Sequence, residues 1–124
     1  IEDITGSLLP GGNVADVMGE RYELRDEQLR MVESVVRAFN DDEVSIIEAG
    51  TGTGKTLSYL IPSAVWAMRN GERVVISTNT INLQEQLIDK DIPLVHKAFG
   101  EAFNYSLVKG MGNYLCLLRA ETVQ

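Results

Sequence analysis

Two kinds of hydrophobic pattern alternate along the chain. Short apolar runs at residues 44–48, 74–78 and 103–109 are bounded by polar or turn-forming residues, as is typical of strands buried in a parallel sheet. Between these runs, apolar residues recur at helical spacing. Because predicted strands alternate with predicted helices, the pattern indicates an α/β fold with a parallel sheet flanked by helices.

Turn-forming residues and prolines set the expected ends of the helices. Asp26 can cap a first helix that runs to about Asn40 and ends at Asn40-Asp41-Asp42. A second helix follows residue 54 and closes at Asn70-Gly71; Pro62 lies inside it and should bend it.

A third predicted helix starts at Asn79-Thr80. Pro93 should interrupt it, and a further turn or two should end at Gly100. The chain again has a helical pattern from Asn113 onward. Residues 1–21 lack periodicity, so we expect a lead-in segment there and a domain over residues 22–124.

Composition favours a soluble domain over a membrane or secreted protein. Of the 124 residues 44% are hydrophobic, yet no apolar run approaches the ~20 residues of a membrane span. The N-terminus has no signal-peptide pattern and the chain has a single cysteine, so we expect a cytoplasmic setting and no membrane partner.

The net charge of −7 argues against a basic, sequence-independent patch for DNA. It does not exclude nucleic acid, because hydroxyls, amides and backbone N–H groups also bind phosphates.

One segment carries a specific chemical signal. It combines alternating glycines with a Lys-Thr pair directly before a predicted helix: Ala49, Gly50, Thr51, Gly52, Thr53, Gly54, Lys55 and Thr56. Glycines let the backbone approach phosphates, and the N–H groups at a helix start form an anion site. Lys55 would reach the β- and γ-phosphates of ATP, and the Thr56 hydroxyl would bind Mg²⁺. The alternative interpretation is a Gly/Thr-rich surface turn that precedes a lysine by chance.

The chain resembles the XPD/DinG helicases of superfamily 2, and the bacterial DinG type more closely than the eukaryotic XPD type. Four segments match the family's Q-motif, motif I, motif Ia and first iron–sulfur cysteine segment, in the family's order: Tyr22–Gln28, Ile47–Thr56, Ser77–Leu87 and Lys109–Cys116. The resemblance covers residues 22–119. It implies a partial RecA-like P-loop NTPase domain, the N-terminal portion of helicase motor domain 1.

The resemblance also implies roles near the nucleotide base. Gln28 occupies the position of the Q-motif glutamine, whose amide can match the N6 amine and N7 of adenine. Tyr22 could stack on the base, and Arg25 stands where the family has an arginine near the nucleotide. The alternatives are an exposed first-turn residue for Gln28 and simple packing for Tyr22.

Thr78, Asn79 and Thr80 correspond to motif Ia, which in the family contacts the backbone of single-stranded DNA. Ordinary helix capping by Asn79 or Thr80 is the simpler interpretation, and both can hold. The partners implied are single-stranded DNA and DNA junctions.

Cys116 corresponds to the first of four thiolate ligands of a [4Fe–4S] cluster in the family. With no second cysteine, this chain cannot assemble that cluster alone. A lone cysteine is otherwise usually a small buried apolar residue. His96, the only histidine, is expected at the surface.

Two parts of a complete ATPase are missing from the sequence. No acidic pair follows a buried strand after residue 56, and no second motor domain supplies an arginine finger. Asp89 and Asp91, which flank Lys90, are assigned to a solvated helix face. We therefore expect ATP binding here, and ATP-driven 5′→3′ DNA unwinding only in a complete parent protein. Another P-loop NTPase, a DinG-like nuclease and a non-catalytic nucleotide-binding module remain as alternatives.

Overall fold

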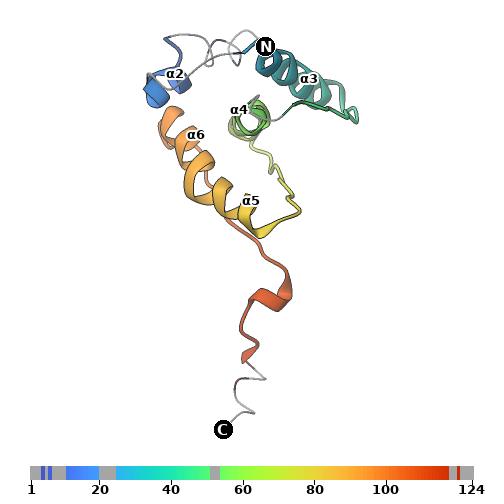
Figure 1. The fold of residues 1–124 in the computed structure, drawn as a ribbon, viewed down its shortest axis with the longest axis vertical. Coiled ribbons are helices and arrows are strands. Elements are labelled where there is room, and N and C mark those ends of the chain that lie inside the picture. The colour runs from blue at the N-terminus through green and yellow to red at the C-terminus, as the bar shows by residue number, and fades with distance from the viewer. Residues whose placement is uncertain are drawn as a thin grey trace.

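Helices form the body of the molecule, with α4 at its centre (Figure 1). The computed structural model describes residues 4, 6, 11–19, 25–50, 54–117 and 120. The helical elements are α2 (Asn13–Met18), α3 (Asp26–Asp41), α4 (Lys55–Asn70), α5 (Ile81–Gln86), a π-helical turn (Leu87–Asp91), α6 (Ile92–Ala98) and a 3₁₀ turn (Met111–Asn113). Helix α4 packs against α3 on one side and α6 on another, and α2 packs against α6.

The predicted α/β class, with its parallel sheet and RecA-like arrangement, is wrong for the described part of the chain, which contains no strand. The three expected strands are irregular segments. Residues 72–78 and 103–108 line one open groove of about 940 Å³. Residues 72–78 also line a second groove of about 890 Å³, together with Glu43, Ser45 and Ile47. None of these described segments forms a strand ladder.

The apolar side chains of these segments show the same thing. Val44, Ile46 and Val75 are 95%, 97% and 89% exposed. An apolar run reports a tendency toward burial, but a strand also needs a neighbouring segment to bond with. That neighbour is absent from the described residues, and the sequence pattern could not reveal this.

The N-cap of helix α3 lies one residue before the predicted cap, Asp26. Arg25 is the N-cap, its backbone N–H donates to Gln28 Oε1 at 3.2 Å, and Asp26 is the first helical residue. Glu or Gln at this third helical position commonly caps the helix in this way. The predicted end is confirmed, because Asp42 takes a left-handed conformation with φ 53°.

Helix α4 is the most deeply buried element. It starts after Gly54, continues through Pro62 and ends at Gly71, whose φ of 66° and N–H bond to the Ala67 carbonyl close the helix as predicted. Its buried residues are Leu57, Ser58, Leu60, Ile61, Pro62, Ser63, Ala64 and Val65. Because they occupy several sides of the helix, neighbouring elements must cover α4 from more than one direction.

The third predicted helix is found as α5, the π-helical turn and α6 in one continuous path. Pro93 has no N–H and its ring would clash with the carbonyl four residues earlier. The wide π-turn precedes Pro93 and accommodates it, so the predicted interruption is a widened turn rather than a break. Gly100, with φ 64°, follows the last helical residues as predicted.

The core extends beyond these helices to residues near the N-terminus. Val14 of α2 is fully buried, and Ile4 also belongs to the core. Residues within 1–21 therefore pack against the helical body.

The C-terminal segment runs away from the helices (Figure 1). Its apolar side chains Met111, Leu115 and Leu117 are exposed. The helix predicted from Asn113 is absent at residues 114–116. Among the described residues, no helix combines the length and apolar character needed to cross a membrane.

Candidate functional site

The predicted phosphate loop leads directly into α4, and its lysine folds back across it. Lys55 Nζ donates to the Ala49 backbone carbonyl at 2.7 Å, so the two ends of the loop meet. Both Lys55 and Thr56 are half-buried, and Gly50 is exposed. Thr51, Gly52 and Thr53 lie outside the described residues. The ammonium group is thus held at the first residue of the predicted loop.

Gly54 makes the turn from loop to helix. Its φ of 71° and ψ of 28° are left-handed, a conformation that glycine adopts at little cost. Its carbonyl accepts from the Ser58 backbone N–H and from the Ser58 hydroxyl, both at 3.3 Å. These bonds fix the first turn of α4.

Gln28 lies against this turn, although it belongs to α3. It is only 5% exposed. A Cβ built on Gly54 would lie 2.8 Å from Gln28 Cδ and would overlap Nε2. The structure therefore brings the predicted adenine-binding residue to the phosphate loop. Arg25 is an exposed N-cap residue, and Tyr22 lies outside the described residues.

Tyr59 is a neighbour of the site that the sequence analysis missed. It lies one helical turn after Thr56 on α4. Burial raises the pKa of Tyr59, the Thr56 hydrogen bond opposes that shift, and the negative charge of Asp91 adds to it. The i, i+3 spacing of Thr56 and Tyr59 on a predicted helix was the available signal.

Two of the three predicted DNA-contacting residues, Thr78 and Asn79, line the 890 Å³ groove, to which Tyr59 also contributes. Thr80 is the N-cap of α5, and its Oγ1 accepts from the Leu83 N–H at 3.3 Å. Thr78 Oγ1 donates to the Thr80 carbonyl at 3.4 Å, and Asn79 is exposed. The capping interpretation is thus confirmed for Thr80, and a DNA role for the three residues stays a prediction.

Two side chains assigned to the surface are less exposed than expected. Asp91 is buried, and its Oδ2 accepts from Gln86 Nε2 at 3.0 Å. His96 is half-buried beside Phe103 and Tyr105, with ring centroids 5.0 and 5.4 Å away. Asp91 lies in the π-turn, and residues 103–105 return beside His96. Neither feature can be inferred from the spacing of residues along the sequence.

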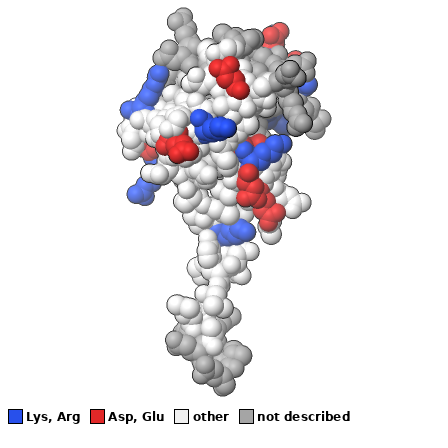
Figure 2. Space-filling view, turned by 90° about the vertical axis from the view of Figure 1, so that its left-hand side faces the viewer, with Lys and Arg blue, Asp and Glu red and all other residues white. Residues whose placement is uncertain are grey.

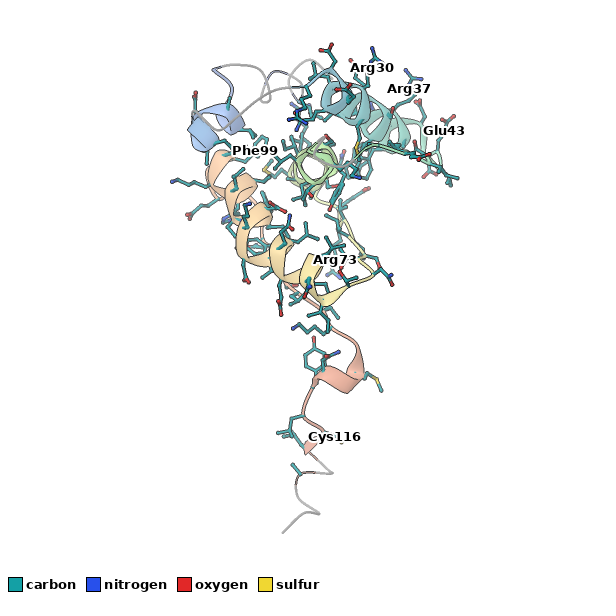
Figure 3. All side chains as sticks on the ribbon, in the orientation of Figure 1. Arg30, Arg37, Glu43, Arg73, Phe99 and Cys116 are labelled. Atoms are coloured by element: carbon teal, nitrogen blue, oxygen red, sulfur yellow. The ribbon has the colours of Figure 1, made fainter. Side chains whose placement is uncertain are left out.

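Cys116 is a free, exposed thiol on the C-terminal segment, far from the helices (Figure 3). A [4Fe–4S] cluster takes four thiolates, and this chain offers one. Among the described residues, no three His, Cys, Asp or Glu side chains gather as a metal site. The residues present do not fit a complete cluster.

The same test favours a nucleotide with Mg²⁺ at the loop. The start of α4 brings together a left-handed glycine, a lysine ammonium and a threonine hydroxyl, at Gly54, Lys55 and Thr56. This donor set matches phosphate oxygens and a hard cation.

Comparison with known families gives one match that covers most of the chain. The family model described as "Type III restriction enzyme, res subunit" matches residues 21–110. The match includes the loop, Gln28 and the Thr78–Thr80 segment.

Curated relatives match this chain at similar levels of sequence identity. The "3'-5' exonuclease DinG" of Bacillus subtilis (strain 168) is 42% identical over 122 residues, 98% of this chain and 12% of the relative. The "ATP-dependent DNA helicase YoaA" of Escherichia coli (strain K12) is 40% identical over 118 residues, 95% of this chain and 18% of the relative. The "ATP-dependent helicase DinG" of Mycobacterium tuberculosis (strain ATCC 25618 / H37Rv) is 42% identical over 97 residues, 75% of this chain and 15% of the relative. The chain thus spans less than a fifth of the length of these relatives.

Proposed function

We propose that this chain, which belongs to the DinG/YoaA-type helicase family, binds ATP with Mg²⁺ at the 49–56 loop and is the nucleotide-binding part of an ATP-driven DNA helicase. Residues 22–124 would form the N-terminal portion of the first motor domain, with residues 1–21 leading into it. The rest of a helicase chain would complete the site.

The observation that supports this proposal best is the position of Lys55. Its Nζ lies 2.7 Å from the Ala49 carbonyl, at the N-terminal end of α4 and beside left-handed Gly54. When triphosphate binds, the ammonium can exchange this carbonyl for β- and γ-phosphate oxygens, a stronger charge-assisted contact. Backbone N–H groups of the loop would bind the remaining oxygens.

The other site residues have supporting roles in this proposal. The Thr56 hydroxyl would hold Mg²⁺, which supplies charge neutralisation at the phosphates. Gln28, which lies against Gly54, would contact the bound nucleotide, and Tyr22 and Arg25 would lie toward the base. Thr78, Asn79 and Thr80 would contact the backbone of single-stranded DNA. The complete protein would move along that strand in the 5′→3′ direction and would act on DNA junctions.

The test is Lys55→Ala in the full-length natural protein. It should abolish DNA-stimulated ATP hydrolysis and weaken ATP binding by roughly 2–3 kcal/mol, because a charge-assisted phosphate contact is lost. Lys97→Ala, an exposed lysine of α6, is the matched control and should retain wild-type turnover. ATP hydrolysis by Lys55→Ala near the wild-type rate would falsify the proposal.

A nuclease is the second candidate, because the Bacillus subtilis relative is named a 3'-5' exonuclease. The same pair of variants separates the two functions. Metal-dependent shortening of end-labelled DNA that persists in Lys55→Ala and needs no ATP would assign the protein to the nuclease class. A helicase without this activity separates strands of unchanged length.

A further inference from the structure

The contact between Gln28 and Gly54 joins two helices at the phosphate loop. Gln28 is in the first turn of α3, and Gly54 is the N-cap of α4. The same Gln28 amide is also held through its oxygen, because Oε1 accepts from the Arg25 N–H at 3.2 Å. The amide is thus fixed on α3 and pressed against the loop.

No side chain fits on Gly54 while Gln28 occupies this place. A Cβ there would overlap Gln28 Nε2 and would lie 2.8 Å from Cδ and 3.3 Å from Cγ. Four other glycines of the described residues also have positive φ: Gly11, Gly19, Gly71 and Gly100. At those four a Cβ would meet nothing within 4 Å. The left-handed backbone conformation alone therefore accounts for glycine at those four positions. Gly54, in contrast, is also in close contact with a buried polar side chain.

We propose that Gln28 is a positioning residue for the phosphate loop. Its anchored side chain supports the Gly54 turn from the α3 side, so that Lys55 and the first N–H groups of α4 face the phosphates. This inference rests on the proposed ATP site and extends it, because it assigns to Gln28 an effect on the triphosphate that is independent of the base.

The two roles of Gln28 make different predictions for a ligand without a base. If Gln28 positions the loop, Gln28→Ala weakens inorganic tripolyphosphate, ATP and GTP alike. If it only reads adenine, Gln28→Ala weakens ATP and leaves tripolyphosphate unchanged, because tripolyphosphate has no base edge to recognise.

The experiment is calorimetric titration of the full-length natural protein with the Mg²⁺ complexes of tripolyphosphate, ATP and GTP. Gln28→Ala should raise the Kd for tripolyphosphate roughly fivefold, the effect of losing one modest polar and packing contact. Val36→Ala, a buried change two turns along α3 that does not touch Gly54, controls for general destabilisation of the helix. It should leave the tripolyphosphate Kd within about twofold of wild type.

A reciprocal measurement tests the contact itself. Gly54→Ala should weaken tripolyphosphate less in the Gln28→Ala background than alone, because the shorter side chain removes the overlap and only the backbone strain remains. If Gln28→Ala does not fold, Gln28→Asn withdraws the amide from Gly54 by one methylene and should show the same loss.

Each outcome separates this inference from the ATP site. Unchanged tripolyphosphate binding in Gln28→Ala or Gln28→Asn, or strictly additive effects of the two changes, would overturn the positioning role and leave the ATP site intact. If the wild-type protein binds neither ATP nor tripolyphosphate, the proposed function fails and the positioning role fails with it.

Discussion

Tyr59 shows how the surroundings of one residue on α4 set its protonation. Burial raises the pKa of its phenol above the ordinary value of 10.0, and the charge of Asp91 acts in the same direction. The Thr56 hydroxyl opposes them through its hydrogen bond. A raised pKa means that the folded state favours the neutral phenol.

This direction of shift fixes the sign of a pH effect on stability. Below pH 10 the phenol is neutral in both the folded and the unfolded chain, so its full contribution is present. As the pH rises above 10 the unfolded chain ionises first, and the contribution is lost as the pH passes through the folded pKa. We predict that the unfolding free energy of the wild type falls more steeply above pH 10 than that of Tyr59→Phe.

Urea unfolding, monitored by the fluorescence of Trp66, the only tryptophan, measures this difference. Between pH 6 and 8 the two proteins should differ by a constant amount, which serves as the control. Curves that stay parallel from pH 8 to pH 11 would contradict the assignment.

Among the elements, helix ends were predictable and strands were not. Asp42, Gly71 and Gly100 end their helices with positive φ at or next to the predicted positions, because turn chemistry depends on a few adjacent residues. The predicted strands failed because strand pairing requires a second segment, often distant in sequence. The exposed Val44 and Val75 show that an apolar run does not supply its own partner.

The N-terminus of α5 has both a structural and a proposed functional role. Thr80 caps the helix through its hydroxyl, and the same residue is proposed to contact DNA. Thr80→Asp keeps a capping oxygen but adds a negative charge, whereas Thr80→Ala removes the cap. We predict that Thr80→Ala lowers stability by about 1 kcal/mol, and that Thr80→Asp keeps stability but weakens single-stranded DNA binding through repulsion.

Chemical denaturation and fluorescence anisotropy with labelled oligonucleotide measure the two effects separately. Serine at position 80 retains the hydroxyl, so Thr80→Ser is the control and should preserve both properties. Wild-type DNA affinity in Thr80→Asp would leave Thr80 with the capping role alone.

At the scale of the whole molecule, the face shown in Figure 2 mixes charges of both signs, and no basic patch dominates it. Arg30 and Arg37 lie along α3, outside the groove that contains Thr78 and Asn79 (Figure 3). With a net charge of −7, this chain would have to bind a DNA backbone mainly through hydroxyl, amide and backbone groups.

The arrangement of the proposed nucleotide site could be predicted from the sequence better than the fold. The loop residues are consecutive, so their proximity follows from the chain itself, and Gln28 was placed near them by resemblance. The Gln28–Gly54 contact and the burial of Asp91 depend on how α3, α4 and the π-turn pack, and spacing along the sequence does not encode packing. The functional roles of these residues stay predictions until ligand binding is measured.

The role of Cys116 depends on the complete protein, because the other three ligands proposed for its cluster are not in this chain. Its thiol is exposed on a segment that leaves the helical body (Figure 3), and one thiolate cannot hold a [4Fe–4S] cluster. We predict that the 124-residue chain is colourless, with one thiol that reacts with Ellman's reagent. The full-length natural protein, purified without oxygen, should absorb broadly near ~400 nm, as iron–sulfur proteins do.

Cys116→Ser should diminish this absorbance and the bound iron of the full-length protein, because it removes one of four ligands. ATP binding should remain at the wild-type level, since Cys116 lies on a segment that runs away from the helical body to which α4 belongs (Figures 1 and 3). Iron analysis and calorimetric titration with ATP on the same preparation provide both measurements. A protein that binds no iron, or that retains all of it after Cys116→Ser, would leave Cys116 as an unligated surface thiol.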